Sequence, residues 1–179
     1  LAIRKQLLQN HLVEAIVILP RNMFYSTDIS VTLWILNNNK KARMVEQNGK
    51  MIRYRNRENE VLFIDLRQWG EPFEKKYIQF SAEQIQQIAE NFHNWQRVGY
   101  EQTYHNEPEY CYSATLDEIE KKGWSLVPSK YIEFRNRDEQ IDFDAKMKQL
   151  QTEMRDLLQQ EEESKQQLKE LFEKLGYTL

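Results

Sequence analysis

Cysteine, glycine and proline are scarce in this sequence, whose 179 residues include one, five and four of them. The single Cys111 excludes an internal disulfide framework and a cysteine-rich zinc site, and this usage is typical of the reducing cytoplasm, where we expect the protein. The closest two glycines are 21 positions apart, which excludes a glycine-rich loop that cradles a phosphate or a dinucleotide. The three histidines have no paired ligand spacing, so we expect no metal site.

Long apolar runs are also missing. No run approaches the roughly 18 residues that cross a bilayer, and Arg4, Lys5 and Gln6 at the start are not typical of a secretory signal. We therefore expect no membrane partner. Aromatic residues, in contrast, make up 12% of the chain, a content that disordered segments lack. Most of the chain should bury a core, and its length fits either one ordinary domain or one small domain with an appendage.

The first forty residues have the pattern of an α/β sheet. Apolar residues recur at helical spacing in residues 1–12, and residues 13–19 are a short, β-branched run, typical of a strand covered on both faces. Residues 29–36 are a second such run. The connection 21–28 is too short for a crossover helix, so the two strands should be antiparallel neighbours. We expect the chain to begin in the middle of a larger α/β domain whose first strands precede it.

Residues 41–66 are expected to form a hairpin followed by a strand. Asn48-Gly49 suits a two-residue hairpin turn, because both of its central positions need positive φ. Residues 61–66 are apolar and are predicted to form the next buried strand.

Two capping boxes mark helix starts further along the chain. Ser81 with Gln84 begins a helix that should end near residue 96, and helical spacing predicts that its buried face consists of Ile85, Ile88, Phe92 and Trp95. Thr115 with Glu118 begins a shorter helix that should stop at Gly123, since glycine accepts the left-handed cap. Residues 126–132 then have an extended pattern.

Charge is unevenly distributed, although the total is only −3. Residues 40–57 contain seven Lys and Arg against Glu46 alone, a local charge of +6. Such a segment attracts phosphates, because each neutralised phosphate releases counterions. The predicted DNA-backbone contacts are Lys40, Lys41, Arg43, Lys50, Arg53, Arg55 and Arg57. The alternative is a solvated hairpin with exposed cations.

Residues 137–179 differ in kind, with seven Lys and Arg against eleven Asp and Glu. Apolar residues recur in steps of three and four, which predicts a long, coiled-coil-like amphipathic helix over residues 141–175. So narrow a stripe favours a partner helix, and the predicted partner-binding residues are Met147, Leu150, Met154, Leu157, Leu168 and Leu171. Glu161 and Ser164 interrupt the stripe, so the helix is expected to kink there or to separate from its partner. The alternative is a helical hairpin that folds back at that point.

Three segments carry a family resemblance. Residues 13–36 read VEAIVILPRNMFYSTDISVTLWIL, residues 61–70 read VLFIDLRQWG, and residues 111–132 read CYSATLDEIEKKGWSLVPSKYI. In this order they resemble the C-terminal part of the modification subunit of type I restriction-modification systems. That family has a Ser-Ala-Thr-Leu-Glu-Glu-Ile stretch that leads to Leu-x-Pro-x-Arg-Tyr. Ser129 and Lys130 depart from its usual Gly and Arg.

The resemblance implies an adenine-specific DNA methyltransferase. As the complete protein, it would transfer a methyl group from S-adenosylmethionine to the exocyclic amine of adenine in DNA. The implied fold is a Rossmann-like methyltransferase sheet. The implied partners are a specificity subunit that reads the DNA sequence, a second modification subunit, a restriction subunit and double-stranded DNA.

Two motifs of the family are missing from this sequence. It has no adjacent prolines, so it lacks the Asn-Pro-Pro-Phe/Tyr motif that orients the target amine, and it lacks the glycine-bearing cofactor motif. We expect no catalytic residue here, and no methyl transfer or bound cofactor in the chain alone. In related enzymes an aromatic residue from the connection after the strand predicted at residues 13–19 stacks on the flipped base. Phe24 and Tyr25 lie in this connection and are therefore the candidates. The alternative is that Phe24 packs beneath the sheet.

The expected architecture is α/β and has three parts. Residues 1–40 close the methyltransferase sheet, residues 41–136 form an α+β extension with the basic hairpin, and residues 137–179 form the helical tail. We expect the chain, as the C-terminal part of a modification subunit, to mediate subunit assembly and proximity to DNA. The alternative is a stand-alone helical dimerisation or interaction module without enzymatic activity.

Overall fold

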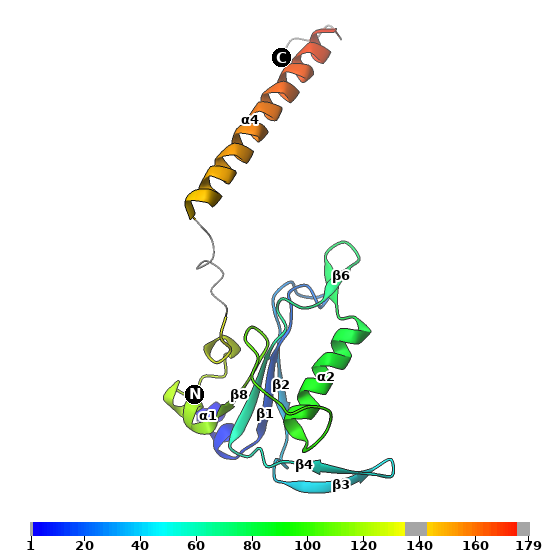
Figure 1. Cartoon of the computed structure of the whole chain (residues 1–179), viewed down its shortest axis with the longest axis vertical. Coiled ribbons are helices and arrows are strands. Elements are labelled where there is room, and N and C mark those ends of the chain that lie inside the picture. Colours follow the sequence, from blue (N-terminus) through cyan, green and yellow to red (C-terminus); the bar gives the residue numbers. More distant parts are fainter. Residues whose placement is uncertain (1, 135–142, 175–179) are drawn as a thin grey trace. The chain divides into compact units, whose positions relative to one another are not determined.

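The computed structural model describes residues 2–134 and 143–174, which belong to two compact units, Leu1–Arg135 and Asn136–Leu179. The first unit is a layered α/β structure, and the second contains one long helix, α4 (Figure 1). Strands from both sides of position 40 share one sheet. The three-part division stays a prediction. Within the described ranges, no helix is both long enough and apolar enough to cross a membrane.

A four-stranded mixed sheet forms the middle layer of the first unit, in the order β2-β1-β5-β8. β1 (Val13–Ile18) runs parallel to β5 (Glu60–Asp65). β2 (Thr32–Leu36) is antiparallel to β1, and β8 (Cys111–Thr115) is antiparallel to β5. The antiparallel pairing of β1 and β2, predicted from their short connection, is confirmed, as is the α/β class.

Helices cover both faces of this sheet. Val61 and Phe63 of β5 pack in one core cluster with residues of α1 (Ala2–Gln9) and α3 (Leu116–Lys121). The alternate residues of β5 pack in a second cluster with α2 (Ala82–Gln96). Figure 1 shows α1 and α2 on opposite sides of the sheet. Because both faces are covered, residues 61–64 of β5 are all apolar, and so is every residue of β1 except Glu14.

β2 is less buried than predicted. The strand begins at Thr32 instead of residue 29, and Leu33, Trp34 and Leu36 are exposed. The prediction of a second covered strand is therefore wrong. The reason is its position, because β2 has a sheet neighbour on one side only in the described part of the chain.

Two hairpins project from the first unit. β3 (Arg43–Gln47) and β4 (Lys50–Tyr54) form one of them, and β6 (Glu71–Phe73) and β7 (Tyr77–Gln79) form the other. The turn between β3 and β4 is Asn48-Gly49, with φ of 53° and 72°. The predicted hairpin turn with two positive φ angles is confirmed.

The capping box that begins α2 is confirmed, since the Ser81 side chain accepts from the Gln84 N–H and the Gln84 side chain accepts from the Ser81 N–H. The predicted buried face is wrong at one position, because Ile85 is exposed. Ile88, Phe92 and Trp95 pack on the sheet as predicted. The helix therefore meets the core through its second half.

Downstream of β8, one expectation holds and another fails. The Thr115–Glu118 capping box is present, and Gly123 has φ of 67°, as predicted for the left-handed cap. Residues 126–132, however, are not simply extended, because they include the short 3₁₀ helix η1 (Pro128–Lys130). The carbonyl of Pro128 accepts from the N–H groups of Tyr131 and Ile132 at 2.9 and 3.0 Å, which closes this turn.

α4 (Phe143–Lys174) is continuous, so the predicted kink at Glu161 and Ser164 is wrong, and so is the alternative helical hairpin. Glu161 and Lys165, four positions apart, form an ion pair of 2.7 Å that stabilises the helix locally. Residues 141, 142 and 175 of the predicted helix lie outside the described residues.

Candidate functional site

One candidate surface lies beyond the carboxyl ends of the parallel strands β1 and β5, where open α/β sheets bind their ligands. Residues 20–28 connect β1 to β2 there. The Asn22 carbonyl accepts from the Ile78 N–H at 3.0 Å, and the rings of Tyr25 and Tyr77 meet edge to face at 4.5 Å. The β6–β7 hairpin therefore supports this loop, and Figure 1 shows both at one end of the sheet.

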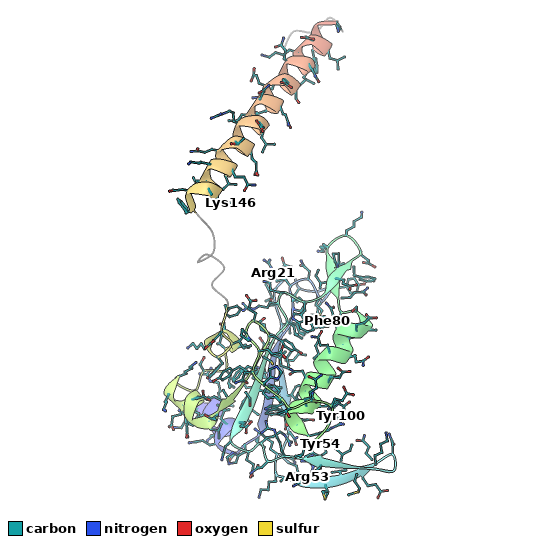
Figure 2. The ribbon with its side chains drawn as sticks, viewed as in Figure 1. Arg21, Arg53, Tyr54, Phe80, Tyr100 and Lys146 are labelled. Atoms are coloured by element: carbon teal, nitrogen blue, oxygen red, sulfur yellow. The ribbon has the colours of Figure 1, made fainter. Side chains whose placement is uncertain are left out.

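Phe24 and Tyr25 both lie on this loop with accessible rings. Phe24 is 40% exposed and Tyr25 is 71% exposed, so the alternative in which Phe24 packs beneath the sheet is wrong. The Arg21 side chain (labelled in Figure 2) closes the loop by donating from its Nε to the Asp28 carbonyl at 3.1 Å. Stacking of either ring on a base stays a prediction.

Asp65, at the end of β5, is buried at the same edge of the sheet. Its carboxylate accepts from the Arg67 guanidinium, with a shortest distance of 2.6 Å, and from the Arg67 backbone N–H at 3.0 Å. The side-chain hydrogen bond to Asp65 raises the pKa of Arg67 above its ordinary value. The pair is therefore a closed ionic contact that stabilises the edge, and the sequence gives no reason to assign it a catalytic task.

Two of the seven cations predicted to contact DNA are buried in the structure, and the other five are half-buried or exposed. Lys40 and Arg57 are only 2% and 1% exposed. Their prediction as DNA contacts is wrong, because a buried cation does not reach a phosphate. The net charge of the segment overstated its surface charge.

Arg57 is buried because it binds Glu14. Its Nε donates to Glu14 Oε1 at 2.8 Å, and its Nη1 donates to the Gln96 carbonyl at 3.2 Å. The pairing of β1 with β2 shifts register between Val13 and Ala15, the position of Glu14. We call Glu14, Arg57 and Lys40 the buried clasp, since they join β1 to the segments that flank the β3–β4 hairpin.

Lys40 completes the buried clasp through backbone carbonyls. Its Nζ donates to the carbonyls of Val13 at 2.7 Å and Glu60 at 2.6 Å, so it links the amino-terminal ends of β1 and β5. Burial lowers the pKa of Lys40 from 10.5 to about 8, although the Glu14 carboxylate opposes this shift.

This shift predicts a specific pH dependence of stability. The folded pKa lies below the unfolded one, so the unfolded chain binds more protons between pH 8 and 10.5, and the free energy of unfolding rises with pH there. Between pH 7.5 and 10 the wild-type chain should gain about 2–3 kcal/mol that Lys40→Met lacks. Urea titrations of both proteins at the two pH values measure this difference. Equal changes in the two proteins would mean that the Lys40 ammonium keeps an ordinary pKa.

Arg55 also forms an ion pair with a carboxylate. Its guanidinium forms two hydrogen bonds with Glu60, at 2.9 and 2.7 Å, and Glu60 further accepts from the Ser113 hydroxyl at 2.9 Å. Burial acts to raise the pKa of Glu60, but the Arg55 guanidinium and the Ser113 hydroxyl hold it below its ordinary value. Arg55 is therefore a weaker DNA candidate than its sequence position suggested.

Exposed cations remain on the hairpin. Lys41, Lys50 and Arg53 are exposed, and the half-buried Arg43 lies over the Tyr54 ring, 4.5 Å from its centroid. These side chains remain candidates for phosphate contacts. They lie near the amino-terminal ends of β1 and β5, whereas Phe24 and Tyr25 follow the carboxyl end of β1, so the two predicted surfaces are at opposite ends of the sheet (Figure 1).

α4 exposes the predicted seam. Its six proposed partner-binding side chains are between 40% and 61% exposed, as given for Met147, Leu150, Met154, Leu157, Leu168 and Leu171. Leu158 lies beside the first four and is also exposed. An apolar stripe of this kind lacks cover within the described part of its own unit, and binding of a partner there stays a prediction.

The described residues do not fit S-adenosylmethionine, the cofactor that the resemblance implies. The four described glycines, Gly49, Gly70, Gly99 and Gly123, lie in separate turns. The parallel strands β1 and β5 continue into Leu19-Pro20 and Leu66-Arg67 instead of into a glycine-bearing turn. No group of three His, Cys, Asp or Glu side chains suited to a metal ion occurs among residues 2–134 and 143–174.

Comparison with known proteins gives consistent relatives. The chain is 33% identical over 177 residues to the HindI type I restriction enzyme methylase subunit of Haemophilus influenzae, covering 98% of this chain and 36% of that protein. It is 31% identical over 175 residues to the MjaIX type I methylase subunit of Methanocaldococcus jannaschii, covering 98% and 29%. The chain thus spans about a third of the length of these curated relatives.

A solved structure has a similar fold. It is the type I restriction-modification methyltransferase subunit of Streptococcus thermophilus, with a TM-score of 0.55 at 22% identity, covering 74% of this chain and 23% of that chain. Residues 1–140 also match the family model described as N-6 DNA Methylase. The family resemblance drawn from the sequence is thereby confirmed. Since the model matches more than three-quarters of the chain, the protein belongs to the N-6 DNA methylase family.

Proposed function

We propose that this chain is the C-terminal part of a type I modification subunit. The complete protein transfers a methyl group from S-adenosylmethionine to the exocyclic amine of adenine in DNA, in the cytoplasm. The observation that carries the proposal is the similarity to type I methylase subunits over 98% of the chain. The parallel β1 and β5 then belong to a Rossmann-like sheet, and the exposed β2 pairs with its remaining strands.

The division of labour within the subunit gives a direct test. The chain lacks the Pro-Pro and glycine motifs, so calorimetry of the 179-residue chain should detect no stoichiometric binding of S-adenosylmethionine. The complete subunit with its specificity subunit should transfer labelled methyl groups to adenine in duplex DNA. Micromolar cofactor binding by the chain alone would contradict the proposed division, and methylation of cytosine would contradict the proposed substrate.

Phe24 and Tyr25 are the proposed stacking partners of the extruded base. Their loop follows the carboxyl end of β1, and both rings are accessible, as stacking on a π face requires. Tyr77 already contacts one edge of Tyr25, so the more weakly engaged Phe24 is the first choice. Single-turnover methylation by the complete subunit should slow in Phe24→Ala and less in Tyr25→Ala. Unchanged rates in both variants would remove the loop from the base pocket.

DNA proximity is the proposed task of the exposed cations Lys41, Lys50 and Arg53. The six residues of β1 span roughly 20 Å between this hairpin end and the Phe24 loop. B-form DNA covers that distance in about six base pairs, so one duplex can meet both ends of the sheet. The two surfaces are therefore compatible with one bound substrate.

Assembly is the proposed task of α4. Its exposed apolar seam is suited to a coiled-coil contact with a helix of a specificity subunit, and a second modification subunit and a restriction subunit complete the proposed complex. The exposed hydrophobic side chains of the helix support this role.

A further inference from the structure

A hollow of about 560 Å³ lies between β4 and the segment that follows α2. Three cations line it: Lys50 and Arg53 of β4, and Arg97 at the end of α2. Tyr100 forms part of the opposite wall, and Figure 2 labels Arg53, Tyr54 and Tyr100 in this region. We call this hollow the β4 groove. Its lining residues, all of them described, include no carboxylate.

Backbone pairing holds the two walls of the β4 groove together. The Val98 N–H donates to the Arg53 carbonyl at 2.8 Å, and the Arg55 N–H donates to the Gln96 carbonyl at 3.0 Å. Residues 96–98 thus extend the β3–β4 sheet at one end. Hydrogen-bonded and non-hydrogen-bonded residue pairs alternate along β3 and β4. Met51 belongs to a non-hydrogen-bonded pair, so its backbone N–H and C=O point away from β3 and toward the groove. The groove therefore has a defined shape before any ligand binds.

Aromatic rings orient the cation on the second wall. The Arg97 guanidinium lies 5.8 Å from the Tyr54 ring centroid and 4.9 Å from that of Tyr100. His93 meets the Tyr100 ring at 5.3 Å, and burial together with the nearby charge of Arg97 lowers the pKa of His93. Cation–π contacts with these two rings therefore position the guanidinium, and they do not neutralise the charge that it offers to a ligand.

The three cations of the groove are also not neutralised by ion pairs. Lys50, Arg53 and Arg97 have no carboxylate partner among the described residues, in contrast to Arg55 and Arg57, which are paired with Glu60 and Glu14. Asn94 fixes the loop beyond the groove by accepting from the N–H groups of Glu101 and Gln102 at 3.2 and 3.0 Å. A preformed, open groove with three free cations and no acid fits a polyanionic chain.

We propose that the β4 groove binds the sugar–phosphate backbone of double-stranded DNA, with Lys50, Arg53 and Arg97 as the phosphate contacts. The choice of DNA rests on the proposed function, whereas the anionic character of the ligand rests on the groove itself. Arg97 and the Tyr100 wall lie outside the basic segment 40–57, so the site joins residues that are separated by more than forty positions. Contacts of this type fix the register of the protein on the duplex without reading its sequence.

The test measures binding of a short labelled duplex to the 179-residue chain by fluorescence anisotropy over a range of salt concentrations. Lys50→Gln with Arg53→Gln should weaken binding about tenfold or more near 0.1 M salt and make the salt slope shallower by about two. The matched control, Lys121→Gln with Lys130→Gln, removes two exposed cations from α3 and η1 and should change the slope by less than one. Arg97→Gln should weaken binding in a chain whose thermal melt is monitored in parallel.

Four results would overturn the assignment to DNA. The first two are equal losses in the groove and control pairs, and no duplex binding by the unaltered chain at low salt. The other two are competition by polyglutamate as strong as that by DNA, and competition by inorganic phosphate at constant ionic strength, which would replace DNA with a small anion. The methylation assay of the complete subunit reports the proposed function separately. If the complete subunit methylates adenine but the groove fails the DNA-binding test, only the assignment of the groove is refuted, and the proposed function is not.

Discussion

Replacing Arg57 with methionine should lower the free energy of unfolding of the first unit by about 3–5 kcal/mol, because it leaves a buried carboxylate unpaired. Glu14 is buried as the second residue of the otherwise apolar strand β1, and its Oε1 accepts from Arg57 and, at 3.2 Å, from Gln96 Nε2. An amide donor alone does not replace the lost positive charge. Urea unfolding followed by circular dichroism measures the change.

Two further variants separate the ion pair from the loss of side-chain volume. The double variant Glu14→Leu with Arg57→Met removes both charges and should recover most of the lost stability, since a well-packed apolar pair can replace a buried ion pair. Arg53→Met, at an exposed position of the neighbouring strand β4, should change stability by no more than about 0.5 kcal/mol. If the double variant is as unstable as Arg57→Met, the packing of the arginine stem and not its charge explains the effect.

The elements of the first unit were largely predictable because local signals agreed with tertiary packing. The capping boxes at Ser81 and Thr115 and the Asn48-Gly49 turn are set by nearby backbone geometry. Failures occurred where burial depends on distant neighbours. Ile85 has helical spacing but lies on the half of α2 that does not meet the core, and β2 is apolar but lies at the edge of the described sheet.

The candidate site was less predictable, because charge in a sequence does not distinguish a buried cation from an exposed one. Lys40 and Arg57 have partners more than twenty positions away, and so has Arg97, which completes the β4 groove. One signal was present and overlooked. Glu14 interrupts the apolar run of residues 13–19, and a carboxylate at a buried position requires a cation, which the basic segment supplies.

Replacing Leu150 and Leu157 of α4 with alanine should weaken assembly with a specificity subunit roughly a thousandfold. Truncation of a buried leucine costs about 2–5 kcal/mol, and each 1.4 kcal/mol is about tenfold in affinity. Alanine has the highest helix propensity, so the loss does not come from unfolding of α4. Calorimetry with the complete modification subunit and a purified specificity subunit measures the change.

The control for this effect lies on the opposite side of the same helix. Thr152→Ala with Gln159→Ala changes positions about 200° around the helix from Leu150 and Leu157 and should leave assembly unchanged. The thermal melt of the 179-residue chain should be similar in both double variants, because the seam side chains are exposed in their own unit. Normal assembly with a strongly lowered melting temperature would mean that the seam packs within the chain. In that case the exposed leucines are part of the fold, and the contact with the specificity subunit must come from another surface.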